Sequence, residues 1–267
     1  MKTHEHDWAP TGLWIDGWLW LPCREPGCEA GLTRAKGELV VGENVFPLSV
    51  GGERLELQDD PIGGVVKIVL RELLDSYFLN DIPFEPGDVV LDVGAHVGVV
   101  SIYLAKKWPG VLIHAFEPMP ENFMRLETNL KANDVKNVKA HPFAVSGNGR
   151  RMRIGGNLQQ NSGGMSAFAS FGKRAAVHTV ESVTLAQIFT RLNVGKCKLL
   201  KMDCEGAEYE ILRTSEGLLD RVEYLSGEFH TNGNLARAGY SPDELLEMCK
   251  RHIAPERIHV TFCRMAE

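Results

Sequence analysis

The sequence predicts a doubly wound α/β domain with a mostly parallel sheet, preceded by an N-terminal extension of irregular and β structure. Short β-branched runs alternate with helical patterns from residue 89 to residue 263, which is typical of this fold class. The run 89–93 leads through a glycine turn into a helix, an arrangement that brings backbone N–H groups close to a ligand. Acidic residues follow several of the runs, where such sheets bind ligands. We therefore divide the chain into an extension, residues 1–63, and a domain, residues 64–267.

Size and charge restrict the classes of function. The 267 residues, 44% of them hydrophobic and 24% charged, fit one domain with an extension. A formal net charge of −6 argues against a broad nucleic-acid-binding surface, which would need clustered Lys and Arg. No run approaches the roughly 18 apolar residues of a transmembrane helix, and the N-terminus lacks the basic-then-apolar order of a signal peptide. We expect a cytoplasmic protein that binds no nucleic acid and spans no membrane, and no feature predicts its oligomeric state.

The extension carries few signals. Alternating side chains over 38–46 predict short strands or a hairpin. Four tryptophans, Trp8, Trp14, Trp18 and Trp20, either line a substrate-facing wall or, as is more common, attach the extension to the domain.

The start of the domain is expected to be helical. Between residues 64 and 80 apolar side chains recur at helical spacing, which predicts an amphipathic helix that either covers a cofactor or only packs. The six cysteines of the chain lack zinc-finger spacing, so we expect free thiols.

From residue 89 onward, predicted strands and helices alternate. The strands cover 89–93, 111–116, 138–145, 198–202, 222–227 and 257–263. Helices follow at 101–107, 120–131, 184–193 and from Ser241, the last with proline at its first position. Two more strand-like segments, 151–154 and 176–183, bracket a polar loop at 157–170, whose length is typical of binding loops or mobile lids.

The glycine turn, residues 92–98, reads Asp-Val-Gly-Ala-His-Val-Gly. It lacks G-x-G-x-x-G because His96 occupies the position of the second glycine, which argues against NAD. It also lacks G-x-x-x-x-G-K-[ST], which argues against a nucleoside triphosphate. The carboxylate of Asp92 favours a nucleoside cofactor whose near end is positively charged, and the alternative is a tight turn without a ligand.

Carboxylates and one imidazole stand at the ends of successive predicted strands: Asp92, Glu117, Asp203, Glu205, Glu228 and His230. Gathered at one edge, these acids would repel one another unless a cation, a positive ligand or protons were present. Glu117 follows Gly94 by 23 positions, close to the spacing at which an acidic residue reaches the hydroxyls of a ribose. S-adenosylmethionine fits this pattern, because its sulfonium and amino groups are cationic and its ribose needs an acidic acceptor.

These residues resemble the FkbM-like family of S-adenosylmethionine-dependent methyltransferases over about residues 64 to 230. The resemblance rests on Asp92-Val93-Gly94-Ala95 with Gly98, Phe116-Glu117-Pro118 with Asn122 and Leu126, Ala144-Val145, the run from Lys201 to Glu208, and Glu228-Phe229-His230. It implies a class I methyltransferase, Rossmann-like fold and O-methylation of a hydroxyl on a small natural product, sugar or glycan. The alternatives are N- or carboxyl-methylation on the same fold, or a non-catalytic partner protein that binds the cofactor.

The resemblance also implies which residues bind S-adenosylmethionine: Asp92, Gly94, His96, Gly98, Ser101, Glu117, Pro118, Ala144, Val145 and Asp203. Three positions depart from the family pattern: asparagine is frequent where this chain has His96 and Met119, and an aliphatic residue is usual at Cys204. Of these, only position 96 is expected to alter cofactor contacts.

His230 is the candidate general base for methyl transfer, because it follows the fifth strand and an imidazole titrates near neutrality. The alternative is a structural histidine at a strand end. Asp203 and Glu205 either orient the substrate or tune His230, or else bind Mg²⁺ or Ca²⁺ and lower the pKa of a substrate hydroxyl. Glu208 is expected to begin a helix and to complement its dipole.

Overall fold

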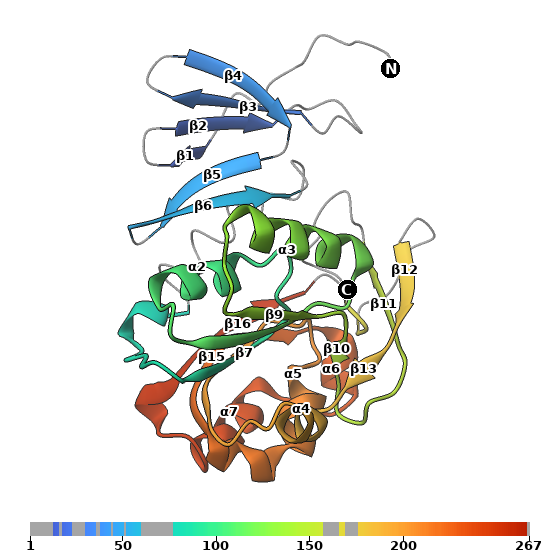
Figure 1. Ribbon diagram of the computed structural model, residues 1–267. Helices are drawn as coiled ribbons and strands as arrows, with labels where there is room; N and C mark the ends of the chain where they lie inside the picture. Colours follow the sequence, from blue (N-terminus) through green and yellow to red (C-terminus); the bar gives the residue numbers. More distant parts are fainter. Residues whose placement is uncertain are drawn as a thin grey trace.

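A six-stranded parallel sheet forms the centre of the protein (Figure 1). This computed structural model describes residues 13–15, 18–22, 30–35, 38–43, 45–50, 52–59, 77–156, 166–168 and 176–265. The strand order is β16-β15-β14-β7-β8-β9, and every neighbouring pair is parallel. In chain order these strands are β7 (Val89–Val93), β8 (Leu112–Phe116), β9 (Val138–His141), β14 (Cys197–Met202), β15 (Val222–Thr231) and β16 (Ile258–Arg264). The order reverses between β7 and β14, which is where open α/β sheets bind ligands. The predicted fold class is confirmed.

Helices cover both faces of this sheet (Figure 1). One face packs against α2 (Val99–Lys107) and α3 (Pro120–Ala132), and the other against α4 (Leu185–Arg191), α5 (Glu208–Thr214) and α7 (Pro242–Lys250). A sheet buried on both faces requires apolar side chains on both sides of its strands. Consistent with this, all six residues of β14 are buried. The short helix α6 (Gly233–Arg237) follows β15.

Two helix starts match the signals in the sequence. Thr184 and Gln187 form a reciprocal capping box at α4, in which each side chain accepts from the other residue's backbone N–H. Ser241 caps α7, and Pro242 occupies its first turn, where a missing N–H is tolerated.

A β-hairpin packs on the outer side of α2 and α3 (Figure 1). It consists of β5 (Val45–Val50) and β6 (Glu53–Gln58), paired antiparallel. Asn129 of α3 and Asn133, which caps the C-terminus of this helix, each bond both the N–H and the carbonyl of one β6 residue, Gln58 and Glu56 respectively, at 2.6–3.0 Å. These two side chains therefore take the place of a partner strand along β6.

The extension contains more regular β structure than expected. Backbone pairing gives a four-stranded antiparallel sheet of β1 (Leu13–Ile15), β2 (Trp18–Pro22), β3 (Ala30–Ala35) and β4 (Glu38–Glu43). The segment 38–46 supplies β4 and the start of β5, but these strands pair with β3 and β6 and not with each other. The tryptophan side chains, the boundary at 63/64 and most of the helix expected over 64–80 lie outside the described residues.

The predicted third strand is divided in two. Residues 138–141 form β9 in the main sheet, whereas β10 (Ala144–Val145) pairs in parallel with β13 (Ser182–Val183). Between β10 and β13 in the chain, β11 (Met152–Gly156) and β12 (Ala176–Val180) form an antiparallel pair. Of the loop expected at 157–170, residues 166–168 are described. Within the described parts of the chain, no helix has both the length and the apolar character needed to cross a membrane.

Candidate active site

The register of three strands places charged side chains in one row. Lys201 of β14 lies opposite Asp92 of β7 on one side and Ser226 of β15 on the other. Because side chains alternate along a strand, Asp203 continues the face of Lys201, while Glu228 and His230 continue the face of Ser226. The backbone N–H of Asp203 still donates to β7, to the carbonyl of Val93 at 3.0 Å, so the pairing extends to this residue. The strand-end residues of β14 and β15 therefore meet on one face of the sheet.

The glycine turn lies directly against the end of β14. Gly94 has a φ of 79°, and a Cβ there would be 1.8 Å from the carbonyl oxygen of Asp203, so only glycine fits. Its carbonyl accepts a hydrogen bond from Nζ of Lys201 at 2.9 Å, and its N–H donates to Phe116 at 3.0 Å. His96 also has a positive φ, 51°, a conformation that non-glycine residues adopt at an energetic cost and that is common at functional sites. The ends of β14 and β8 thus both fix the shape of the turn.

Asp92 and Ser101, both expected to bind the cofactor, contact each other beneath the turn. The Ser101 hydroxyl donates to Asp92 Oδ2 at 2.7 Å, and Lys201 Nζ lies 3.2 Å from Asp92 Oδ1. Neither Asp92 nor Ser101 is exposed at all. Their side chains therefore join β7 to α2 from below, and the backbone of the turn lies above them.

Glu117 connects the turn to the end of β8. Its two carboxylate oxygens accept hydrogen bonds from the backbone N–H groups of His96 and Met119, both at 2.9 Å. Burial raises the pKa of Glu117 to about 7, although these hydrogen bonds act in the opposite direction. Burial likewise lowers the pKa of His96 to about 4, so this imidazole is neutral at pH 7.

The residues expected to line the adenine pocket separate into two apolar clusters. Ala144 packs with Met119 and Met152, whereas Val145 belongs to the large core cluster on the side of α4 and α5. Pro118 is half-buried next to Met119. Of Ala144 and Val145, it is therefore Ala144 that packs with the segment after β8.

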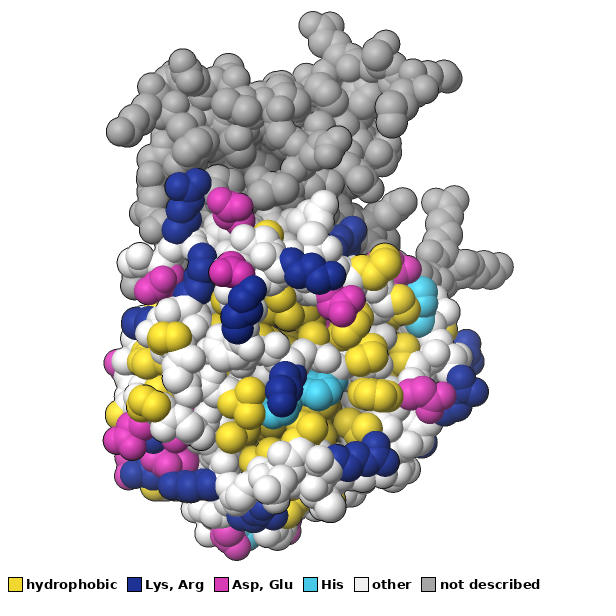
Figure 2. All heavy atoms as spheres, in the orientation of Figure 1, with side chains coloured by type: hydrophobic (Ala, Val, Ile, Leu, Met, Phe, Trp, Pro, Cys, Tyr) yellow, Lys and Arg dark blue, Asp and Glu magenta, His cyan; other side chains and the backbone are white. Residues whose placement is uncertain are grey.

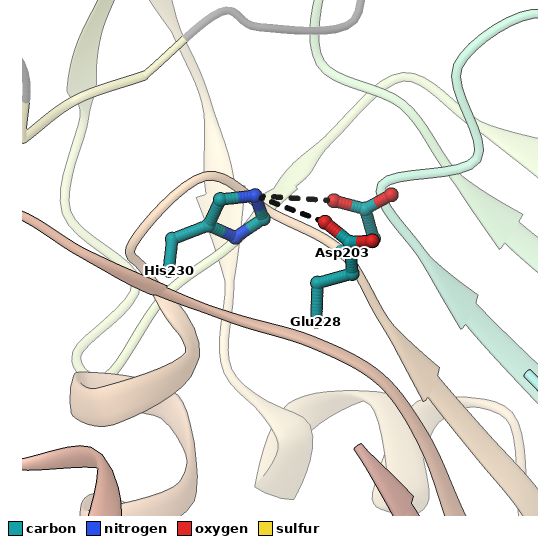
Figure 3. Close-up of side chains that lie close together, drawn as sticks. All are labelled: Asp203, Glu228 and His230. Atoms are coloured by element: carbon teal, nitrogen blue, oxygen red, sulfur yellow. Dashed lines mark ion pairs between the residues drawn. The ribbon is translucent and has the colours of Figure 1, made fainter. Parts of the chain in front are cut away.

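Carboxylates surround His230. Its Nδ1 lies 3.1 Å from Glu208 Oε1, and its Nε2 lies 3.8 Å from Asp203, 3.6 Å from Glu205 and 3.6 Å from Glu228. Figure 3 shows the carboxylates of Asp203 and Glu228 on the Nε2 side of the ring. Burial lowers the pKa of His230, but the hydrogen bond to Glu208 and the neighbouring carboxylates outweigh it and raise the pKa to about 10. The pKa of this imidazole therefore lies above the neutral range expected from the sequence, and its role as a base stays a prediction.

Asp203 and Glu205 differ in their charge. Burial acts to raise the pKa of Asp203, but Lys201 and His230 outweigh it and hold that pKa below its usual value. The Tyr77 hydroxyl also donates to Asp203 Oδ2 at 2.9 Å. Burial raises the pKa of Glu205 to about 8, so this carboxyl is mostly protonated at pH 7. Glu205 has a φ of 55°, a second strained backbone position at the site.

Glu208 also belongs to this site, although the sequence predicted for it only a role at the start of a helix. It begins α5, as expected, but its carboxylate is fully buried. It accepts hydrogen bonds from the backbone N–H groups of Cys204 and Gly206, at 3.0 and 2.9 Å, and lies against His230. It therefore orients the imidazole in addition to capping the turn.

Two further residues were missed, Tyr77 and Lys201. The position of Lys201, two residues before Asp203 on a strand, is a signal that places both side chains on one face. No local signal points to Tyr77, because its contact with Asp203 joins residues that lie 126 positions apart.

Comparison with known proteins identifies the family. Residues 92–252 match the methyltransferase FkbM domain. Methyltransferase 1 of Beauveria bassiana is 23% identical over 186 residues, which cover 60% of this chain and 74% of that protein. The 31-O-demethyl-FK506 methyltransferase FkbM of Streptomyces tacrolimicus is 38% identical over 68 residues, 25% of this chain and 26% of that protein. The match thus spans about three quarters of the first relative and about a quarter of the second.

Among solved structures the likeness is distant. The precorrin-6y C5,15-methyltransferase of Geobacter metallireducens GS-15 is 16% identical, with a TM-score of 0.40 and coverage of 68% of this chain and 70% of that one. The family assignment therefore rests on the domain match, which covers more than half of the chain. This protein belongs to the FkbM methyltransferase family.

Proposed function

We propose that this S-adenosylmethionine-dependent methyltransferase methylates a hydroxyl oxygen of a small natural product, sugar or glycan. The observation that carries the proposal is the set of carboxylates Asp203, Glu205 and Glu228 around His230, beside the glycine turn. Such a site favours a cationic sulfonium over the anionic pyrophosphate of NAD. The name of the Streptomyces relative, a 31-O-demethyl-FK506 methyltransferase, supports oxygen as the acceptor atom.

The residues at this end of the sheet fit S-adenosylmethionine, which supplies a methyl group on a positively charged sulfur when bound. We assign contacts with the cofactor to the backbone of the turn, at Gly94, His96 and Gly98. Glu117 binds the ribose, and Pro118, Ala144 and Val145 line the adenine pocket. Asp203 faces the cationic end of the cofactor. Asp92 and Ser101 act through the turn, because their side chains are buried beneath it.

The acceptor hydroxyl is held by Asp203 and Glu205. The Asp203 side chain is 23% exposed and its pKa is lowered, so an ionised oxygen is available to receive a hydrogen bond from the hydroxyl. His230 orients these carboxylates from behind, since its side chain is only 6% exposed. Much of the rate of methyl transfer comes from such positioning of the acceptor oxygen.

A small-molecule acceptor agrees with the charge of the protein. The formal net charge is −6. On the face shown in Figure 2, Lys and Arg side chains are interspersed with acidic and apolar ones and are not gathered in one patch. Clustered Lys and Arg are the usual sign of a nucleic-acid-binding surface, and this face does not display them. The cytoplasmic location expected from the sequence stays a prediction.

The test uses the full-length protein with S-adenosylmethionine labelled on the methyl group and a panel of hydroxylated acceptors. We expect label in a product that resists alkaline hydrolysis, as a methyl ether does. Release of the label as methanol would indicate a carboxyl-methyltransferase, and transfer to amines alone would indicate an N-methyltransferase. Binding of the cofactor without transfer to any acceptor would support a non-catalytic partner protein.

The role of His230 is tested separately with His230→Ala. We expect a lower rate of methyl transfer with the affinity for S-adenosylmethionine nearly unchanged, because His230 contacts the carboxylates that are proposed to hold the acceptor hydroxyl. An equal loss of rate and affinity would show that His230 is structural.

A further inference from the structure

We propose that Asp203, Glu228 and His230 form a binding site for a divalent first-row transition-metal cation. One ligand atom from each of the first three residues lies within 4.8 Å of the other two. Figure 3 shows both carboxylates directed at the same ring nitrogen, Nε2 of His230. Sequence reasoning considered only Asp203 and Glu205, and the imidazole changes the kind of cation that fits.

The distances around Nε2 fit coordination better than hydrogen bonding. Nε2 lies 3.8 Å from Asp203, 3.6 Å from Glu205 and 3.6 Å from Glu228. A hydrogen bond would bring one oxygen to about 2.7–3.2 Å, and no described residue makes such a bond to Nε2. Metal–ligand bonds of about 2.0–2.2 Å place tetrahedral ligand atoms about 3.3–3.6 Å apart. The His230 side chain, which is only 6% exposed, thus places Nε2 at nearly this spacing from the carboxylate oxygens of Asp203 and Glu228.

Neighbouring residues hold the ligands in orientations suited to a cation. Glu208 accepts from Nδ1 of His230, so a cation that binds Nε2 would displace the proton of that nitrogen and complete the carboxylate–histidine–metal arrangement of known sites. Glu208 is itself held by two backbone N–H groups of the preceding turn. The Tyr77 hydroxyl occupies Oδ2 of Asp203, so that Oδ1 is the oxygen directed at the ring.

The Lys201 ammonium does not compete for this position. It lies 4.0 Å from Oδ2 of Asp203, the oxygen turned away from His230, and its own hydrogen bond goes to Gly94. The positive charge of Lys201 is directed at Asp92 and at the turn, at 3.2 and 2.9 Å. The ion pair of Lys201 with Asp203 thus involves the carboxylate oxygen that does not face Nε2.

The ligand set selects the class of metal. A site with one imidazole and two carboxylates suits cations from Mn²⁺ to Zn²⁺ better than Mg²⁺ or Ca²⁺, which prefer oxygen ligands alone. The side chains of Asp203 and Glu228 are 23% and 13% exposed, so the site opens toward the end of the strands. A cation there would polarise the acceptor hydroxyl as a Lewis acid. This consequence rests on the proposed function, whereas binding of the cation does not.

The experiment uses full-length protein without a histidine tag, treated with a chelator and titrated with Mn²⁺ alone. The loss of the free Mn²⁺ signal in electron paramagnetic resonance reports binding. We expect saturation at one Mn²⁺ per chain, and pulsed measurements on the bound ion should show coupling to one imidazole nitrogen. Absence of saturable binding below millimolar Mn²⁺, or a bound ion without nitrogen coupling, would overturn the proposal without requiring any variant.

Variants then assign the site. His230→Ala and Glu228→Gln should each weaken Mn²⁺ binding at least tenfold, with circular dichroism confirming the fold. The matched control is His252→Ala, whose imidazole lies between Asp220 and Glu216 at the surface. Binding that is lost in His252→Ala and kept in Glu228→Gln would place the ion elsewhere. Binding of S-adenosylmethionine by the metal-free protein is measured in parallel. Absence of cofactor binding with intact Mn²⁺ binding would refute the proposed function alone. Cofactor binding without Mn²⁺ binding would refute the metal site alone.

Discussion

Replacement of Gly94 by alanine tests whether the glycine turn and the end of β14 form one unit. The left-handed φ of 79° costs an L-residue about 1–2 kcal/mol. The added Cβ would also lie 1.8 Å from the carbonyl oxygen of Asp203, so the turn and the strand end must separate. Overpacking of this kind costs about 1–3 kcal/mol. We therefore expect Gly94→Ala to lower the free energy of unfolding by about 2–5 kcal/mol.

Two other glycines separate these contributions. Gly87 has a φ of 94° with nothing within 4 Å of the added Cβ, so Gly87→Ala should cost only the backbone part, about 1–2 kcal/mol. Gly195 has neither a positive φ nor a close neighbour, and Gly195→Ala should change stability by less than about 1 kcal/mol. Urea denaturation measures all three, and calorimetry measures S-adenosylmethionine binding. If Gly94→Ala matched Gly87→Ala in stability and kept full cofactor affinity, the reasoning would be refuted.

Three further predictions follow from buried polar groups. Because the pKa of Glu117 is raised to about 7, its carboxylate is progressively protonated below that pH and loses an acceptor for the ribose. Cofactor affinity should therefore fall by up to about tenfold per pH unit below the pKa. Calorimetry of Glu117→Gln should show weaker cofactor binding that lacks this pH dependence. Lys201→Met leaves the fully buried Asp92 carboxylate without its cation. This should lower the free energy of unfolding by about 3–5 kcal/mol and the melting temperature by about 6–20 °C. An unchanged melting curve would contradict the role given to Lys201. Asn133→Ala removes two hydrogen bonds to the backbone of β6, and hydrogen exchange should show faster opening of this strand while β7 stays protected; Asn129→Ala should act in the same way.

The central sheet was predictable because its signals are local. The apolar runs of β7 and β14 are short and bounded by turns, and strands alternating with helices leave few alternatives to a parallel sheet. The starts of α4 and α7 were equally readable, since Thr184 and Ser241 cap their helices within three residues of themselves. Each of these decisions depends on neighbours in the sequence.

Features set by distant partners were not predictable. The strand expected over 138–145 divides because the backbone N–H of Ala144 leaves the main sheet and donates to the carbonyl of Glu181, the residue between β12 and β13. The outer side of β6 is covered by side chains of α3 from 71 to 77 positions away. Nothing in the local pattern of either segment encodes these partners.

The site shows the same division. The strand-end rule brought Asp203, Glu205, Glu228 and His230 together correctly, because it depends only on where strands end. The raised pKa of His230 was not predictable, since it depends on Glu208, and the backbone N–H groups of residues 204 and 206 hold Glu208 against the ring. A motif gives the identity of these residues, whereas the pKa depends on distances that only the folded chain has.

The central claim is that the acid-lined end of β7, β14 and β15 selects a cationic nucleoside cofactor. Calorimetry on one sample of the full-length protein, titrated separately with S-adenosylmethionine and with NAD, tests it most directly. We predict binding of one S-adenosylmethionine per chain at micromolar affinity and no heat of binding with NAD. Binding of NAD without binding of S-adenosylmethionine would contradict the account.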